Sequence, residues 1–129
     1  MQGLVLALFG ACVGSFTNVV AWRLPRQESV VVPSSHCPRC GHGVRWHDNL
    51  PVVGWLLLLG RCRDCRSPIS VRYPIVEALS AGLWLSAAYV QPSGGGDLPT
   101  AVLPWAGLPL IALLLPLVLI DLDHMWLPE

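Results

Sequence analysis

Three long apolar segments alternate with polar stretches along the chain. The first covers residues 3–22 without a charged side chain, the second covers residues 73–90, and the third covers residues 104–120. A helix of about 20 residues rises about 30 Å, which is the thickness of the hydrocarbon core of a bilayer. The pattern therefore predicts an all-α polytopic membrane protein with about three transmembrane helices.

The polar stretch at residues 23–72 separates the first two apolar segments. It holds all eight arginines of the chain, which has no lysine, and it is rich in proline and glycine. Arginine-rich loops beside membrane spans stay on the cytoplasmic side. We therefore expect an outside N-terminus, a first transmembrane helix at 1–22, a cytoplasmic loop at 23–72, and the second and third transmembrane helices within 73–129.

Two shorter stretches complete this arrangement. Residues 91–103 contain three successive glycines and no arginine, which indicates a flexible connector outside the cytoplasm. Residues 50–59 are apolar but too few to span a bilayer. We expect them either to lie in the membrane surface or to cover the loop, with Trp46 and Trp55 at headgroup depth.

Composition supports a membrane protein and argues against a nucleic-acid binder. Apolar residues make up 53% of the chain and charged residues 12%, whereas soluble domains carry about 25% charged residues. The formal net charge is zero. The arginines are confined to one loop and do not coat a folded domain, as they would in a nucleic-acid-binding protein.

Four of the five cysteines form two Cys-x-x-Cys pairs in the arginine-rich loop, namely Cys37 with Cys40 and Cys62 with Cys65. This spacing is typical of a four-thiolate zinc ribbon. Two disulfides are disfavoured in the reducing cytoplasm, and a redox motif needs a neighbouring strand–helix unit. We expect a structural Zn²⁺ that supplies much of the folding energy of the loop. Three nearby histidines are expected to be solvated or to lie around the ligands: His36, His42 and His47.

Small residues recur on one face of the first apolar segment. Gly10, Gly14 and Asn18 are spaced four residues apart, so they lie on one side of a helix. Such a face lets a second helix approach closely, and Asn18 can donate a hydrogen bond across the contact. We expect a packing role for Asn18 rather than a chemical one, and a buried position for Cys12 as a small side chain.

Three acidic residues near the predicted cytoplasmic boundary are candidate functional groups. Glu77, inside the second segment, is either a functional carboxylate or an acid stabilised by the start of its helix and by Arg72. Asp121 and Asp123 directly follow the third segment, where it would meet the cytoplasm. A pair of aspartates sharing a proton would indicate proteolysis. Residues two apart on a helix point to nearly opposite faces, so this dyad is incomplete within the chain, and two solvated acids remain the alternative.

An ordered series of motifs resembles the amino-terminal half of bacterial type IV prepilin peptidases. The series covers nearly the whole chain except the connector. It comprises Gly14-Ser-Phe-Thr-Asn-Val-Val20, Arg23-Leu-Pro25, Cys37-Pro-Arg-Cys40, Asn49-Leu-Pro51, Trp55-Leu, Gly60-Arg-Cys62, Cys65, Ile69-Ser70, Arg72-Tyr-Pro-Ile-Val-Glu77, and Asp121 followed by Leu127-Pro128. Gly54 departs from the series, because many relatives have serine there.

The resemblance implies a membrane aspartic peptidase of the bacterial inner membrane. It would cleave the leader of type IV prepilins and type II secretion pseudopilins at the cytoplasmic face, with Asp121 as the first catalytic aspartate. It also implies methylation of the new N-terminus by S-adenosylmethionine, for which the sequence shows no glycine-rich fingerprint. The second aspartate of the family lies in a Gly-x-Gly-Asp motif that this chain lacks. We therefore expect a truncated front half that is inactive alone, with a non-enzymatic zinc-ribbon adaptor for a cytoplasmic partner as the alternative.

Overall fold

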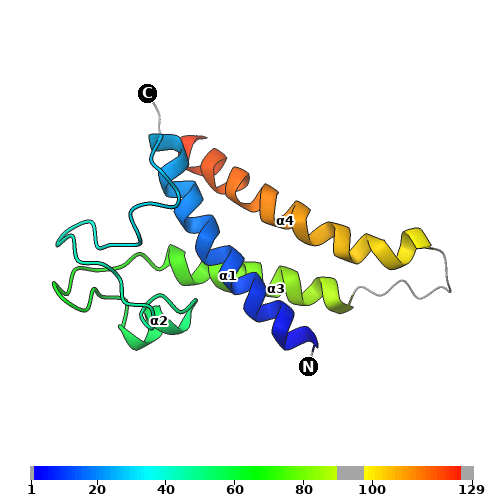
Figure 1. The fold of residues 1–129 in the computed structure, drawn as a ribbon, viewed down its shortest axis with the longest axis horizontal. Coiled ribbons are helices and arrows are strands. Elements are labelled where there is room, and N and C mark those ends of the chain that lie inside the picture. The colour runs from blue at the N-terminus through cyan, green and yellow to red at the C-terminus, as the bar shows by residue number, and fades with distance from the viewer. Residues whose placement is uncertain (1, 90–97, 126–129) are drawn as a thin grey trace.

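The computed structural model describes the backbone of residues 2–89 and 98–125, and the side chains of 3–86, 89 and 107–123. Within these ranges the regular elements are helices, and the only strand-like pairing is two isolated bridges in the loop. The elements are α1 (Gln2–Arg23), the 3₁₀ turn η1 (Leu24–Arg26), α2 (Val53–Leu57), α3 (Arg72–Tyr89) and α4 (Leu98–Met125). Figure 1 shows the three long helices together and the segment between α1 and α3 as a separate lobe.

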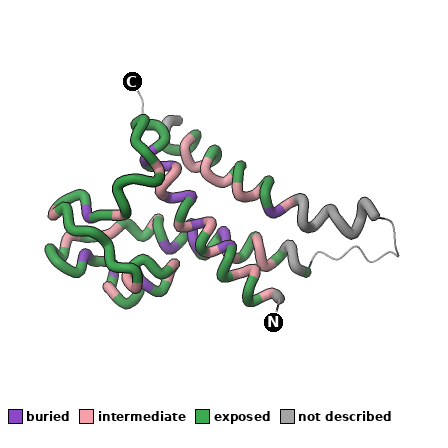
Figure 2. Tube along the Cα trace, in the orientation of Figure 1, coloured by how far each residue is buried: buried purple, intermediate pink, exposed green. Residues whose placement is uncertain are grey.

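Most of the buried residues that the structure describes lie where α1 packs against α3, and the others lie in the loop and on α4 (Figure 2). A Cβ atom added to Gly14 would lie 2.8 Å from the Cα of Glu77, and one added to Gly10 would lie 2.6 Å from the Cβ of Trp84. The two helices therefore approach so closely that only glycine fits, which confirms the predicted packing face. The prediction that Cys12 is buried is wrong. Cys12 lies two residues from Gly14 and so points to the opposite side of α1.

Helix α4 lies against α1 and α3 with fewer contacts than those two make with each other. Its outer face exposes a row of large apolar side chains: Leu110, Leu113, Leu114, Leu117 and Val118. A row of this size is typical of a surface that contacts lipid or another protein. The described face is therefore compatible with the predicted third span.

The start of α4 differs from the prediction. The helix begins at Leu98 rather than at Pro104, so residues 98–103 are helical and not part of a flexible connector. Pro99 is the second residue of the helix, where the missing N–H has no intrahelical partner in any case. Residues 91–97 of the predicted connector, and the Leu127-Pro128 motif, lie outside the described residues.

One helical stretch in the described part of the chain, Gly3–Arg26, is long and apolar enough to cross a membrane by length and composition. The predicted helical fold is therefore confirmed, and one of the three predicted spans is a candidate by this criterion. The other two transmembrane helices stay a prediction. In α3, Arg72 and Glu77 interrupt the apolar sequence within the first six residues.

The apolar stretch at residues 50–59 forms a tight turn followed by the short helix α2. Trp55 donates its indole N–H to the carbonyl of Ile69 over 3.1 Å, and a Cβ on Gly60 would lie 2.7 Å from its ring. Trp55 therefore covers the cysteine-rich loop, as one of the two expected alternatives proposes. Trp46 is 80% exposed.

Candidate functional site

The first Cys-x-x-Cys pair forms a tight knuckle. The backbone N–H of Cys37 donates to the carbonyl of His42 over 2.9 Å, and the N–H of Gly41 donates back to the carbonyl of Cys37 over 2.9 Å. Gly41 has a φ of 73°, a left-handed conformation that glycine adopts without steric cost. The turn brings Cys37 and Cys40 to the same side of the loop.

The second pair repeats this knuckle 25 residues later. The N–H of Cys62 donates to the carbonyl of Ser67 over 2.8 Å, and the N–H of Arg66 donates to the carbonyl of Cys62 over 3.0 Å. Arg66 takes the left-handed position of the turn with a φ of 59°. Each knuckle is closed by one isolated antiparallel bridge. The loop is therefore built from two copies of one turn.

The four sulfur atoms of the knuckles meet in one cluster. The Sγ atoms of Cys37, Cys40, Cys62 and Cys65 all lie within 4.8 Å of one another. The Cys37–Cys65 separation is 3.7 Å and the Cys40–Cys62 separation is 4.0 Å. Zn–S bonds of about 2.3 Å give a tetrahedron with edges of about 3.8 Å, and a disulfide requires about 2.05 Å. The cluster is positioned to bind a metal ion, and its dimensions fit zinc.

The three histidines lie outside this sulfur cluster. His36 and His42 are exposed and His47 is half-buried. His36 Nδ1 lies 3.1 Å from the carbonyl oxygen of Ser34, and His47 lies beside Asp48. None belongs to the group of side chains that the described structure brings together for a metal, as the sequence predicts.

Hydrogen bonds distribute negative charge unevenly among the sulfurs. The backbone N–H of Cys40 and the hydroxyl of Ser67 lower the pKa of Cys37 to about 6. The same hydroxyl, 3.1 Å from the sulfur, lowers the pKa of Cys65. The backbone N–H of His42 lowers the pKa of Cys40, but desolvation and the neighbouring thiols outweigh it and raise that pKa to about 12. A cation bound among the sulfurs would displace the remaining thiol protons.

An ion pair supports the loop beside the cluster. Arg63 donates from Nε and Nη2 to both carboxylate oxygens of Asp48, over 2.7 and 2.5 Å. The Asp48 side chain is only 5% exposed, and the Arg63 guanidinium holds the pKa of Asp48 below its usual value. This two-point contact joins the segment before α2 to the second knuckle.

Glu77 connects this loop to the helices. It is 7% exposed on α3, and its Oε2 accepts the backbone N–H of Val52 over 2.6 Å. Val52 has a φ of 62°, which is a strained conformation for a β-branched residue. Arg72, which the sequence places near Glu77, pairs instead with Asp123. Glu77 thus holds a strained turn of the loop against α3.

Asn18 acts across the contact between α1 and α3. It is 5% exposed, and its Nδ2 donates to the carbonyl of Tyr73 over 3.3 Å. This confirms the predicted hydrogen bond between helices. Because the acceptor lies in the first turn of α3, the bond fixes the start of that helix beside α1.

The two aspartates near the end of α4 have different surroundings. Arg72 donates from Nη1 to Asp123 over 2.7 Å, which ties the start of α3 to the end of α4. Asp121 is exposed and lies about 200° around the helix from Asp123. Its carboxylate therefore points away from the side of α4 on which Arg72 lies, and the structure does not bring Asp121 and Asp123 together.

Ser67 and Asp48 are the functional residues that the sequence predictions miss. Ser67 occupies the position in the second knuckle that His42 occupies in the first, 25 residues earlier. The repeated spacing could have identified the position, but not the hydroxyl contacts with two sulfurs. Asp48 has no sequence signal, because its partner Arg63 is one of several nearby arginines.

Comparison with known proteins identifies the family. The protein-family model described as the bacterial peptidase A24 N-terminal domain matches residues 8–91 of the chain. The chain is 48% identical to the prepilin leader peptidase/N-methyltransferase of Myxococcus xanthus, over 95% of this chain and 35% of that protein. It is 42% identical to the type 4 prepilin-like proteins leader peptide-processing enzyme of Escherichia coli, over 93% of this chain and 49% of that protein.

A prepilin leader peptidase/N-methyltransferase of Klebsiella pneumoniae is 39% identical, over 100% of this chain and 56% of that protein. The chain thus spans about a third to just over half of the length of these relatives. No solved structure matches it. On the family match and the identities to these relatives, the chain belongs to the bacterial peptidase A24 N-terminal domain family.

Proposed function

We propose that this chain forms the amino-terminal part of an inner-membrane aspartic peptidase that removes the leader of type IV prepilins and type II secretion pseudopilins. The observation that carries the proposal is the match over nearly the whole chain to prepilin leader peptidases. The pairing of Arg72 at the start of α3 with Asp123 near the end of α4 supports a site in which these two helix ends share one membrane face.

The exposed Asp121 carboxylate is assigned the catalytic role. Aspartic peptidases use two carboxylates that share one proton, one activating water and the other acting as acid. Asp123 is held by Arg72, so Asp121 is the carboxylate available to a second aspartate. That second aspartate would come from a Gly-x-Gly-Asp motif outside this chain. Glu77 and Asn18 support the site by fixing the loop and α3, respectively.

The four cysteines would hold Zn²⁺ as a structural ion. The metal supplies folding energy to a loop with little apolar core, and the Ser67 hydroxyl stabilises the sulfur charge. The names of the Myxococcus xanthus and Klebsiella pneumoniae relatives include N-methyltransferase. The described residues do not identify a site for S-adenosylmethionine, so we assign methyl transfer to no side chain of this chain.

Membrane topology forms part of the proposal. With three spans, the loop at residues 23–72 and the end of α4 share the cytoplasm, and the N-terminus lies outside. The arginines of the loop support this orientation. A membrane-impermeant maleimide added outside intact cells should therefore label neither Cys37 nor Cys65.

The test is cleavage of a prepilin by this sequence joined to the carboxy-terminal half of the Klebsiella pneumoniae relative. Asp121→Asn should abolish cleavage, while the matched Asp123→Asn should retain most of it because Asp123 only positions the end of α4. Full cleavage by Asp121→Asn would refute the assignment. No cleavage by the parent protein, with the prepilin bound and unprocessed, would favour the non-enzymatic adaptor.

A further inference from the structure

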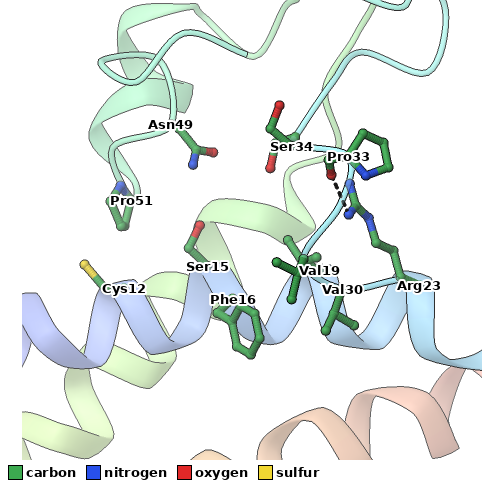
Figure 3. A pocket seen from close by; sticks show the side chains of 12 residues that line it. Cys12, Ser15, Phe16, Val19, Arg23, Val30, Pro33, Ser34, Asn49 and Pro51 are labelled. Atoms are coloured by element: carbon green, nitrogen blue, oxygen red, sulfur yellow. Dashed lines mark hydrogen bonds between the residues drawn. The ribbon is translucent and has the colours of Figure 1, made fainter. Parts of the chain in front are cut away.

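A groove separates α1 from two segments of the loop. It has a volume of about 410 Å³ and is lined by one face of α1, the segment around Pro33 and the turn around Pro51. Figure 3 shows Ser15 reaching into it from α1, Asn49 from the opposite wall, and the Arg23 side chain at one end. The proposed peptidase function assigns no role to this groove.

Buried charged side chains hold both loop segments that form its walls. Arg23 Nη1 donates to the carbonyls of Ser29 and Pro33, over 3.0 and 2.7 Å. Glu77 accepts the N–H of Val52 beside Pro51. The groove is therefore a defined feature of the fold and not a gap between loosely placed loops.

Arg23 carries a buried charge that has no acidic partner in the described structure. It is 8% exposed, and no carboxylate of the described residues lies within 4.0 Å of it. Both carbonyls accept hydrogen bonds from Nη1. The N–H groups on Nε and Nη2 are therefore left for another acceptor. A buried charge is stable when an opposite charge or further hydrogen bonds accompany it.

The lining of the groove is complementary to an anion. The polar side chains that line the groove besides Arg23 are Ser15, Ser34, Ser35 and Asn49. Ser15 lies toward the end away from Arg23 and hydrogen-bonds Glu77, so the hydroxyls of Ser34 and Ser35 and the Asn49 amide are the donors that remain for an anion. No aspartate or glutamate is among the twelve lining residues. A guanidinium with neighbouring hydroxyl groups is the donor set that proteins use for phosphate.

We propose that the groove binds a phosphate group through Arg23. Arg23 is the last residue of α1, and if α1 crosses the bilayer the guanidinium lies near the level of the lipid phosphates. The apolar part of the lining, Phe16 and Val19 on α1, would contact the remainder of the bound molecule. The phosphate belongs to either an anionic lipid headgroup or a soluble molecule, and this proposal is independent of the proposed peptidase function.

The test follows the Arg23 side chain directly by NMR. The full chain with ¹⁵N-labelled arginine is placed in phosphatidylcholine nanodiscs, and the Arg23 Nε–H signal is identified by its loss in Arg23→Lys. One arm titrates inorganic phosphate at constant ionic strength. The other arm replaces part of the lipid with phosphatidylglycerol. A saturable shift in the first arm identifies a soluble phosphate, and a shift in the second arm alone identifies a lipid headgroup.

Two comparisons make the result specific to the groove. Arg26 is the internal control, because it is exposed and stacks over the ring of Trp22. Its signal should shift several-fold less than that of Arg23. Ser34→Leu fills the groove but leaves the carbonyl partners of Arg23 in place, so it should remove the Arg23 shift without loss of bound metal. Equal shifts of Arg23 and Arg26, no shift in either arm, or an unchanged Arg23 shift in Ser34→Leu would overturn the proposal.

Discussion

Glu77 on α3 accepts a 2.6 Å hydrogen bond from the backbone N–H of Val52 in the cysteine-rich loop. This bond joins the part of the molecule that holds the metal ligands to the part that holds the helices. It also stabilises Val52 at a φ of 62°, where the side chain is strained. A change at Glu77 should therefore affect the docking of the loop and not the metal cluster itself.

Replacement of Glu77 tests this docking. Glu77→Ala leaves the Val52 N–H without its acceptor, and loss of such a buried bond should destabilise the docked loop by about 1–3 kcal/mol. Hydrogen exchange at the amides of Val52 and Val53 should become faster, while the bound metal is retained. Glu77→Gln keeps an acceptor oxygen and should restore most of the protection. The exposed Glu28 provides the control, and equal exchange in Glu28→Ala and Glu77→Ala would contradict the docking role.

Loss of one cysteine ligand should remove the metal. Cys37→Ser or Cys62→Ser replaces a thiolate with a much weaker ligand for zinc, so bound metal should fall from about one ion per chain towards none. The loop should then become sensitive to protease. Elemental analysis of the purified protein measures this directly.

Cys12→Ser is the matched control for these variants. Because Cys12 lies on α1 away from the cluster, the Cys12→Ser protein should keep its bound metal. Undiminished zinc in Cys37→Ser and Cys62→Ser would show that the four-thiolate assignment is wrong.

Two glycines in the long helices should respond oppositely to substitution by alanine. A Cβ on Gly14 would lie 2.8 Å from the Cα of Glu77, whereas one on Gly82 would meet nothing within 4 Å. Gly14→Ala forces α1 and α3 apart and should destabilise the fold by about 1–3 kcal/mol. Gly82→Ala should be neutral, or stabilising by up to about 1 kcal/mol through helix propensity. Denaturation in detergent measures the free energy of unfolding of both variants. A Gly14→Ala protein as stable as the parent would contradict the close packing of α1 and α3.

The ion pair between Asp48 and Arg63 should give the loop an acid-dependent stability. Hydrogen bonds from Arg63 hold the pKa of Asp48 below its ordinary 3.8. The stabilisation is therefore complete above the unfolded pKa near 3.8 and is lost as the pH falls through the lower folded value. Arg63→Gln should destabilise the loop at pH 7, and this destabilisation should diminish as the pH falls through the lowered pKa of Asp48.

Carboxyl ¹³C titration of Asp48 measures this shift. The midpoint should lie below 3.8 in the parent chain and move upwards in Arg63→Gln. Arg45→Gln is the comparison, because Arg45 makes a smaller contribution to the same shift. An Asp48 midpoint that Arg63→Gln leaves unchanged would exclude the pair as its cause.

The sequence alone predicts those features that depend on residues close together in the chain. The apolar segments predict the long helices, and the spacing of Gly10, Gly14 and Asn18 predicts the face on which α1 packs, because helical periodicity places them on one side. The two Cys-x-x-Cys pairs predict the thiol cluster, because a knuckle is a local turn. The start of α4 was less predictable, because proline is compatible with both a connector and the first turn of a helix.

The tertiary structure decides which distant groups meet. Glu77 reaches Val52 across 25 residues, and Arg72 reaches Asp123 across 51, whereas their closeness in the sequence suggested that Arg72 and Glu77 stabilise each other. Ser67 is placed on two sulfurs only once both knuckles have come together. The groove beside Arg23 exists because α1 and the loop are fixed against each other by buried side chains. Such contacts depend on the relative orientation of whole elements, which local propensity and periodicity do not specify.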